Sequence, residues 1–252
     1  MRNIDMTPVV ADNKKPFRIP RWFYFFILFL IVVGLICYFL FFSKTFSVTS
    51  VEIEGTKKVP EESVRKLADQ AIQKKNNIWL FQIDVVEKEI KANYKEIDSV
   101  TFRRGLPHTI KIIVSERKPV ILWQSGTKIY LVDDLGYTYE ELVGDSDLPR
   151  VIDNKAIPVK LGERFLSSEF IVFVQNLSKN YKPETGKTVK SMAVDETTFE
   201  LNLIDERDEK IIFDTSRDLE SQLRNLNLAY KKTGEGKVSY IDLRVESWVY
   251  YK

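Results

Sequence analysis

One uninterrupted apolar run, Trp22 to Phe42, constrains this chain more than any other feature. The run contains no charged residue. At about 1.5 Å per residue, a helix of this length reaches about 31 Å, close to the thickness of a bilayer hydrocarbon core. A secretory signal is the main alternative, but its apolar core is shorter and ends at a small-residue cleavage site. This run ends in Phe-Leu-Phe-Phe, so we expect an uncleaved transmembrane anchor over residues 22–42.

The charges that flank the run predict its orientation. After the run Lys44 stands alone until Lys57, whereas four basic residues crowd the preceding side: Lys14, Lys15, Arg18 and Arg21. Cytoplasmic flanks of membrane spans carry the excess of Lys and Arg. We therefore expect residues 1–21 to form a cytoplasmic tail and everything after residue 42 to lie outside the cell membrane.

Composition narrows the class of the external part. The whole chain has a net charge of +2, and residues 1–42 alone hold five Lys/Arg against two Asp, so the remainder is close to neutral. A nucleic-acid binder needs a basic face, which this balance does not provide. Cys37 is the only cysteine and lies in the apolar run. The external part must therefore be held by hydrophobic cores without a disulfide, which favours a bacterial surface over a eukaryotic secretory one.

The first external segment predicts a β-α-α-β-β order. A strand pattern covers residues 48–55, and Pro60 opens a helix with an apolar stripe that includes Val64 and Ala68. A second helix follows, with Asp84 as its expected capping residue and Val86 and Ile90 on its apolar face. Alternating residues over 100–103 and 110–115 then predict two strands joined by a turn at residues 105–108.

The second external segment is rich in strands. Short strand patterns cover residues 120–123, 129–132, 137–139, 148–152, 199–203 and 211–213. Ser167 or Ser168 is expected to cap a helix with Phe170 and Val174 on one face, and Leu223 and Leu226 stripe a further helix that stops at residues 234–236. The expected fold class is therefore α+β, with one transmembrane helix before two mixed domains.

No catalytic, cofactor-binding or metal-binding constellation emerges from the sequence. His108 is the lone histidine and follows Pro107 in an expected turn. As a general base it would need a nucleophile and an orienting partner, so we expect a solvated turn residue. The segment around Gly234 and Lys237 lacks the spacing of a phosphate-binding loop. The acidic cluster over residues 205–209 is expected to be a solvated hairpin turn. We therefore expect no enzyme, no cofactor and no small-molecule substrate.

The last expected strand, Val238 to Tyr250, is the best candidate for a binding site. Ile241, Leu243, Val245 and Val249 fall on one face, which suits a core, and Trp248 and Tyr250 fall on the other. A strand at a sheet edge leaves backbone groups unpaired, so another chain can add a strand there. Exposed aromatic residues are common anchors in interfaces. The candidate partner-binding residues are Arg244, Val245, Glu246, Ser247, Trp248, Val249 and Tyr250, and Arg103 with Arg104 form a second candidate partner surface.

Four local patterns together resemble one family. They are Val48-x-x-Val51-x-Ile53-x-Gly55, residues 100–110 (VTFRRGLPHTI), residues 114–123 (VSERKPVILW) and Tyr240-Ile-Asp242-Leu-Arg244. With the short tail and single span, these patterns resemble the FtsQ/DivIB cell-division proteins. The resemblance implies a cytoplasmic tail (1–21), a transmembrane helix (22–42), a POTRA domain (43–117) and a family-type β domain (118–252).

The resemblance also implies a function and partners. It implies a non-enzymatic, single-pass protein of the bacterial division septum that recruits and regulates peptidoglycan-synthesis partners. Its expected partners are small bitopic division proteins, FtsB/DivIC-like and FtsL-like, besides the membrane itself. Two alternatives stay open at this point: a membrane-tethered enzyme acting on the cell wall, and a POTRA-containing secretion component.

Overall fold

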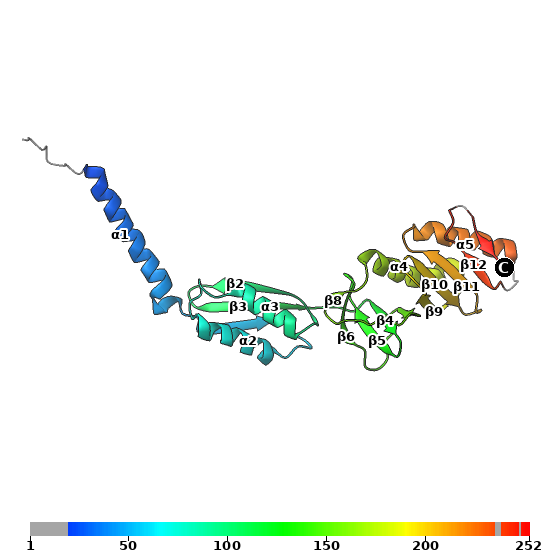
Figure 1. Ribbon diagram of the computed structural model, residues 1–252, viewed down its shortest axis with the longest axis horizontal. Coiled ribbons are helices and arrows are strands. Elements are labelled where there is room, and N and C mark those ends of the chain that lie inside the picture. The colour runs from blue at the N-terminus through cyan, green and yellow to red at the C-terminus, as the bar shows by residue number, and fades with distance from the viewer. Residues whose placement is uncertain (1–19, 235–237, 247) are drawn as a thin grey trace, which may run out of the picture.

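The computed structural model describes residues 20–234, 238–246 and 248–252. Most of the expected tail (residues 1–19) and Ser247 therefore lie outside the described residues. Figure 1 shows three parts in succession along the long axis: an isolated helix, a small sheet with its helices, and a larger sheet with its helices at the C-terminal end. The observed class is α+β, as the sequence predicts.

The isolated helix α1 (Arg21–Phe42) coincides with the apolar run. None of its residues is buried within the chain, and the helix is long and apolar enough to cross a membrane. A helix that is apolar on every side and touches no protein core has the properties of a membrane span. A short 3-10 turn, η1 (Lys44–Phe46), follows it directly.

The small sheet and its helices form the three-stranded unit. Its strands are β1 (Ser50–Glu54), β2 (Ile97–Gly105) and β3 (Thr109–Glu116), in the spatial order β1-β3-β2. β1 runs parallel to β3, and β2 runs antiparallel to it. The helices α2 (Glu61–Lys74) and α3 (Ile83–Asn93) bury their apolar stripes against the strands. The expected β-α-α-β-β order is confirmed.

The larger sheet and its helices form the ten-stranded unit. In space the strands follow the order β13-β12-β11-β10-β9-β7-β4-β5-β6-β8. The helices α4 (Ser168–Thr185) and α5 (Leu219–Thr233) pack against each other and against one large core cluster shared with the sheet. The strand bounds are Ile121–Ser125 (β4), Lys128–Val132 (β5), Tyr137–Glu141 (β6), Arg150–Asp153 (β7), Glu163–Arg164 (β8), Val189–Val194 (β9), Glu200–Asp205 (β10), Lys210–Asp214 (β11), Tyr240–Asp242 (β12) and Tyr250–Tyr251 (β13).

The helix starts test the capping predictions. Ser167 caps α4 as expected, because its hydroxyl accepts the backbone N–H of Phe170. The prediction for Asp84 is wrong: α3 begins at Ile83, and Asp84 lies inside the first turn without capping it. An acidic residue in the first turn still interacts favourably with the positive end of the helix dipole. An aspartate is therefore suitable both as a capping residue and inside the first turn.

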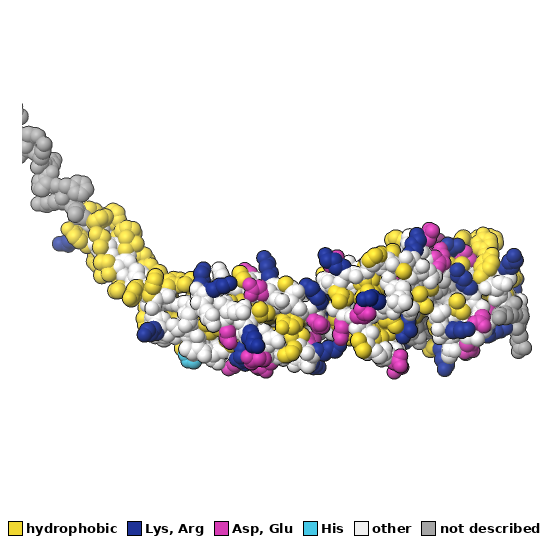
Figure 2. Space-filling model, turned by 60° about the horizontal axis from the view of Figure 1, so that its bottom comes forward, with side chains coloured by type: hydrophobic (Ala, Val, Ile, Leu, Met, Phe, Trp, Pro, Cys, Tyr) yellow, Lys and Arg dark blue, Asp and Glu magenta, His cyan; other side chains and the backbone are white. Residues whose placement is uncertain are grey.

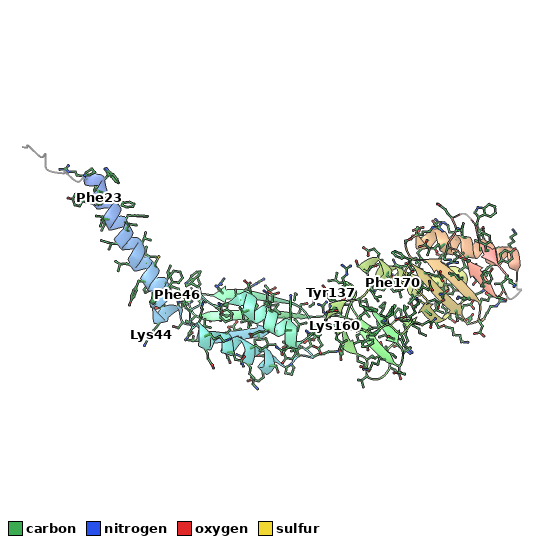
Figure 3. All side chains as sticks on the ribbon, viewed as in Figure 1. Phe23, Lys44, Phe46, Tyr137, Lys160 and Phe170 are labelled. Carbon is green, nitrogen blue, oxygen red and sulfur yellow. The ribbon has the colours of Figure 1, made fainter. Side chains whose placement is uncertain are left out.

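Arg117 joins the two units. Its guanidinium pairs with the carboxylate of Asp133 and lies 4.2 Å from the centre of the Tyr137 ring. Its Nε donates to the carbonyl of Lys95 at 3.3 Å, so one side chain contacts both units. Figure 3 shows Tyr137 and Lys160 on the side of the ten-stranded unit that faces the three-stranded unit.

Candidate partner-binding edge

The ten-stranded sheet ends at β13, which lies next to the C-terminus. Tyr250 is opposite Asp242 and Tyr251 is opposite Ile241 in an antiparallel pair with β12. The backbone of Lys252 extends this pairing, because its N–H donates to the carbonyl of Tyr240 at 3.3 Å. Among the described residues, no strand pairs with the outer side of β13.

The expected continuous strand from Val238 to Tyr250 is wrong. After β12 the chain returns as the antiparallel strand β13, and the described residues between the two strands, 243–246 and 248–249, are not part of any strand. Ile241 and Leu243 are buried in the core as expected, but Val245 is exposed instead of facing the core. Of the candidate binding residues, Arg244, Val245, Glu246 and Trp248 therefore belong to a loop beside the edge, and Tyr250 belongs to the edge strand itself.

Local hydrogen bonds explain why the strand stops after Asp242. The Asp242 carboxylate accepts the backbone N–H of Arg244 at 3.0 Å and its guanidinium Nη2 at 2.7 Å. The same guanidinium pairs with Glu200 on β10. An aspartate that bonds to the backbone two residues later favours a turn over a continued strand. The loop is thus attached to the sheet by Arg244.

The pairing of Asp242 with Arg244 has an electrostatic consequence. Burial alone would raise the pKa of Asp242, but the hydrogen bonds and the charge of Arg244 outweigh burial and hold that pKa below its usual value. The hydrogen bond from Asp242 correspondingly raises the pKa of Arg244. Both groups are charged at neutral pH. Arg217 adds a further link, because its guanidinium donates to the carbonyl of Arg244 at 2.8 Å.

Large aromatic side chains lie exposed around this edge. Trp248 is 67% exposed and Tyr250 is 52% exposed, and Tyr251 is also exposed. Figure 2 shows hydrophobic side chains reaching the surface at this end of the molecule. Val249, between the two aromatic residues, instead packs against the core cluster and holds the returning chain in place. The edge therefore combines unpaired backbone with aromatic side chains on an anchored loop.

A buried charge cluster lies next to the start of β12, the strand that pairs with the edge strand β13. The ammonium of Lys187 lies 2.7 Å from Glu209, 3.5 Å from Asp205 and 3.3 Å from the centre of the Tyr230 ring. Burial alone would lower the pKa of Lys187, but its hydrogen bond to Glu209 helps to raise it above the usual value. The other oxygen of Glu209 accepts the backbone N–H of Val238 at 3.3 Å, close to the start of β12.

The expectation of a solvated turn at residues 205–209 is therefore wrong in part. Asp205 and Glu209 are buried, whereas Asp208 between them is exposed. The Asp205 carboxylate accepts the backbone N–H groups of Arg207 and Glu209, which shapes the hairpin between β10 and β11. The sequence shows only a mixed charge run, because the counter-ion Lys187 lies far away in the chain.

The second candidate surface lies in the three-stranded unit. Arg103 and Arg104 are exposed near the end of β2. Arg104 donates from Nε to the carbonyl of Ile78 at 2.9 Å, in the loop that links α2 and α3. His108 is exposed in the neighbouring turn, as expected. Within the described residues, no group of three or more His, Cys, Asp or Glu side chains is placed to hold a metal ion.

Comparison with known proteins assigns the three-stranded unit. Residues 46–117 match the family model described as POTRA domain, FtsQ-type. This range covers the strands and helices of the three-stranded unit from η1 to the residue after β3. Because the matched range ends at Arg117, the residue that contacts both units lies at the boundary of the matched module.

Curated relatives extend the similarity beyond this module. The chain is 28% identical to a cell division protein FtsQ of Chloroflexus aurantiacus over 85% of this chain and 78% of the relative. It is 27% identical to a cell division protein FtsQ of Rickettsia typhi over 63% of this chain and 54% of the relative. A cell division protein DivIB of Clostridium tetani is 29% identical over 54% of this chain and 49% of the relative.

The matches differ in how much of each relative they include. The chain spans about half the length of the Rickettsia typhi and Clostridium tetani relatives, and more than two thirds of the Chloroflexus relative. All three names refer to cell division, and the module match names the same family. Together with the apolar helix α1 and the observed α+β fold, these matches show that the chain is similar to the FtsQ and DivIB cell-division proteins, with an FtsQ-type POTRA match over residues 46–117.

Proposed function

We propose that this chain is a non-enzymatic assembly protein of the bacterial division site, anchored by α1 and acting through its external units. In this proposal residues 1–21 lie in the cytoplasm, 22–42 span the membrane, 43–117 form the POTRA domain and 118–252 form the β domain. Residues 43–252 lie outside the cell membrane, enriched at the septum, and recruit and regulate septal peptidoglycan-synthesis partners. The partners are FtsB/DivIC-like and FtsL-like bitopic proteins.

One observation carries the proposal: the sheet ends in a short strand with unpaired backbone, beside exposed aromatic residues. The N–H of Lys252 donates to β12, and successive N–H groups of a strand point in alternate directions. The N–H of Tyr251 therefore points to the open side, where an added strand would accept it. Backbone pairing would provide affinity and Trp248 and Tyr250 would provide anchors.

The observed loop revises how the candidate residues would act. Arg244, Val245, Glu246, Trp248 and Val249 do not pair as a strand, so strand addition is assigned to Tyr250 and Tyr251. Trp248 contributes from the loop, and Arg244 holds the loop to the sheet through Asp242 and Glu200. Ser247 lies outside the described residues and stays a candidate binding residue by its position in the sequence alone.

Proline substitution on the edge strand tests the proposal. Tyr251→Pro removes the outward N–H, a change that edge strands tolerate because that group makes no bond within the sheet. We expect it to weaken partner binding at least tenfold relative to Tyr251→Ala, which keeps the N–H. Calorimetric titration of the full-length protein in detergent with the external part of a DivIC-like partner measures both affinities.

A matched proline at the opposite end of the sheet provides the control. Arg164→Pro changes β8, the edge strand at the other end. It removes an N–H that points away from β6, because the N–H of the next residue, Phe165, donates to the carbonyl of Gly136. This change should leave partner affinity unchanged. Equal affinities for Tyr251→Pro and Tyr251→Ala, with both variants folded by circular dichroism, would exclude strand addition at β13. Loss of binding in Arg164→Pro alone would move the partner site to the opposite edge.

Protease accessibility tests the proposed orientation. The basic residues before α1 predict that the long C-terminal part lies outside the membrane. Protease added to intact protoplasts should digest residues 43–252 and leave the N-terminal tail protected. Protection of the external units from protease would contradict this orientation, and with it the proposed site of partner binding.

A further inference from the structure

The three-stranded unit is attached directly to the end of α1. The Nδ2 of Asn77 donates to the carbonyl oxygens of Leu40 and Phe41 at 3.0 and 3.1 Å. The last carbonyls of a helix lack partners within the helix, and these two obtain theirs from the loop between α2 and α3. Asn77 is buried. The loop that contains it is therefore fixed to the last turn of the span.

Phe46 strengthens this attachment. Its carbonyl accepts the N–H of Ile78 at 2.9 Å, and its ring lies 5.7 Å from that of Phe39 and 6.2 Å from that of Trp79, centre to centre. Figure 3 shows Lys44 and Phe46 where α1 meets the three-stranded unit. A side chain that contacts both the span and Trp79 places the turn at residues 78–80 close to the level at which α1 leaves the membrane.

Two turns at this end expose large apolar side chains. Trp79 and Leu80 lie in the turn that follows Asn77, and both are exposed. Leu106, in the turn between β2 and β3, is 56% exposed. The two turns belong to the same end of the unit, because Arg104 donates to the carbonyl of Ile78 and the N–H of Thr49 donates to the carbonyl of His108.

Basic residues strongly outnumber acidic residues at this end of the unit. The segments 43–50, 74–85 and 103–109, which surround the two turns, contain one acidic residue, Asp84. They contain five basic residues: Lys44, Lys74, Lys75, Arg103 and Arg104. Basic residues at the membrane surface are attracted to anionic lipids, and Trp is enriched at the boundary between headgroups and acyl chains.

We propose that this end of the three-stranded unit rests on the outer surface of the bilayer that holds α1. We call it the docking face and define it by Trp79, Leu80, Leu106, Lys44, Lys75 and Arg103. Trp79 and the two leucines insert at the headgroup level, while the basic residues contact anionic headgroups. A lipid surface is favoured over a protein because Asn77 and Phe46 already join this face to the end of the span.

Spin labels on the full-length protein test this proposal. In a Cys37→Ser background, which removes the cysteine of the span, single labels are placed at Leu80→Cys and Leu106→Cys, with Val143→Cys as the comparison site. Val143 is 95% exposed in a loop of the ten-stranded unit. The protein is reconstituted in vesicles of phosphatidylcholine alone or mixed with phosphatidylglycerol, and collision with a water-soluble nickel chelate and with oxygen is measured for each label.

We expect the labels at 80 and 106 to be several-fold less accessible to the nickel chelate, and more accessible to oxygen, than the label at 143. Phosphatidylglycerol should increase this difference. Combining Lys75→Glu with Arg103→Glu should abolish the increase. The control variant combines Lys231→Glu with Lys232→Glu, two exposed positions on α5 in the other unit. It should leave the increase caused by phosphatidylglycerol unchanged.

Two results would overturn the proposal. Labels at 80 and 106 that are as accessible to the nickel chelate as the label at 143, in both kinds of vesicle, would show that the face does not contact lipid. Protection that arises only after a soluble partner protein is added would identify the face as a protein interface instead. Circular dichroism of each labelled protein confirms that the fold is retained in either case.

Discussion

The ten-stranded sheet ends in a two-residue strand on each side, but the two ends have different surroundings. At the β8 end, Gly162 lies so close to Lys95 of the other unit that an added Cβ would be 2.5 Å from the Lys95 side chain. At the β13 end, Trp248 beside the strand and Tyr250 within it are exposed. Short edge strands limit unwanted sheet pairing, and a neighbouring domain limits it further. Among the described residues, one edge of the sheet, the closed end, therefore lies against the other unit of the chain, whereas the edge at β13, the open end, stays exposed, as the proposed partner site requires.

The largest expected effect concerns the buried charges behind the open end. Lys187→Met leaves the buried carboxylates of Asp205 and Glu209 without their main counter-ion. This change should lower the free energy of unfolding by about 3 kcal/mol or more. Hydrogen exchange of the β11 and β12 amides should accelerate accordingly. The control Lys190→Met breaks an exposed pair with Asp208 and should cost less than about 1 kcal/mol. Equal exchange in both variants would show that the cluster does not support the open end.

The matching change at the closed end is Arg117→Met. It leaves Asp133 buried without its ion pair, although that carboxylate still accepts the N–H groups of Leu135 and Tyr137. We therefore expect a smaller cost of about 2 kcal/mol, seen as faster exchange in the turn between β5 and β6. Lys58→Met, which breaks the more exposed pair with Glu140, is the control. An unchanged exchange rate for Arg117→Met would mean that the junction is held by other contacts.

Exposed apolar residues at the two ends should differ in their effect on partner binding. Trp248→Ala, at the open end, should weaken binding by about 1–3 kcal/mol, as for an aromatic anchor. Leu135→Ala removes an exposed side chain at the closed end and should leave the affinity unchanged. Calorimetry with the same partner measures both. An equal loss for both substitutions would contradict the assignment of a single open edge.

The smallest expected effect is on acid stability. Near the closed end, burial alone would raise the pKa of Glu116, but hydrogen bonds from the backbone N–H groups of residues 57–59 outweigh burial and lower it. At the open end, Arg244 lowers the pKa of Asp242 in the same way. A carboxyl with a lowered pKa stabilises the fold above its unfolded pKa, about 4, and loses that contribution as the pH falls further. Glu116→Gln and Asp242→Asn should each flatten the decline of stability below about pH 4.5. Urea unfolding from pH 6 to pH 2.5 measures this slope, and a slope unchanged in either variant would contradict the assigned pairing.

Local patterns predicted most of the elements. The apolar run became α1, and the alternation over residues 100–115 became the β2–β3 hairpin. In the ten-stranded unit Ser167 capped α4 as expected. These features depend on neighbours within a few residues, which a sequence displays directly. β9 was not predicted, because Lys190 and Ser191 interrupt its apolar pattern and its pairing with β7 and β10 comes from distant segments.

The C-terminal segment lies at a sheet edge, as the sequence suggested, but its conformation was not predicted. The alternation from Ile241 to Val249 favours one strand, whereas hydrogen bonds between Asp242 and Arg244 turn the chain back. The buried cluster was missed for a related reason. Lys187 and Glu209 meet only after β9, β10 and β11 have paired, and neither residue alone differs from a surface charge in sequence. Contacts of this kind arise from tertiary structure.

The amide of Asn77 has a mechanical consequence. It binds the last carbonyls of α1 to the three-stranded unit, and Arg117 binds that unit to the next one. When α1 tilts or rotates, for instance as it packs against another membrane helix, we therefore expect the two external units to move with it, as the arm of a lever does. The open edge lies at the far end of this lever (Figure 1), so small changes of angle in the bilayer become large displacements of β13 above it.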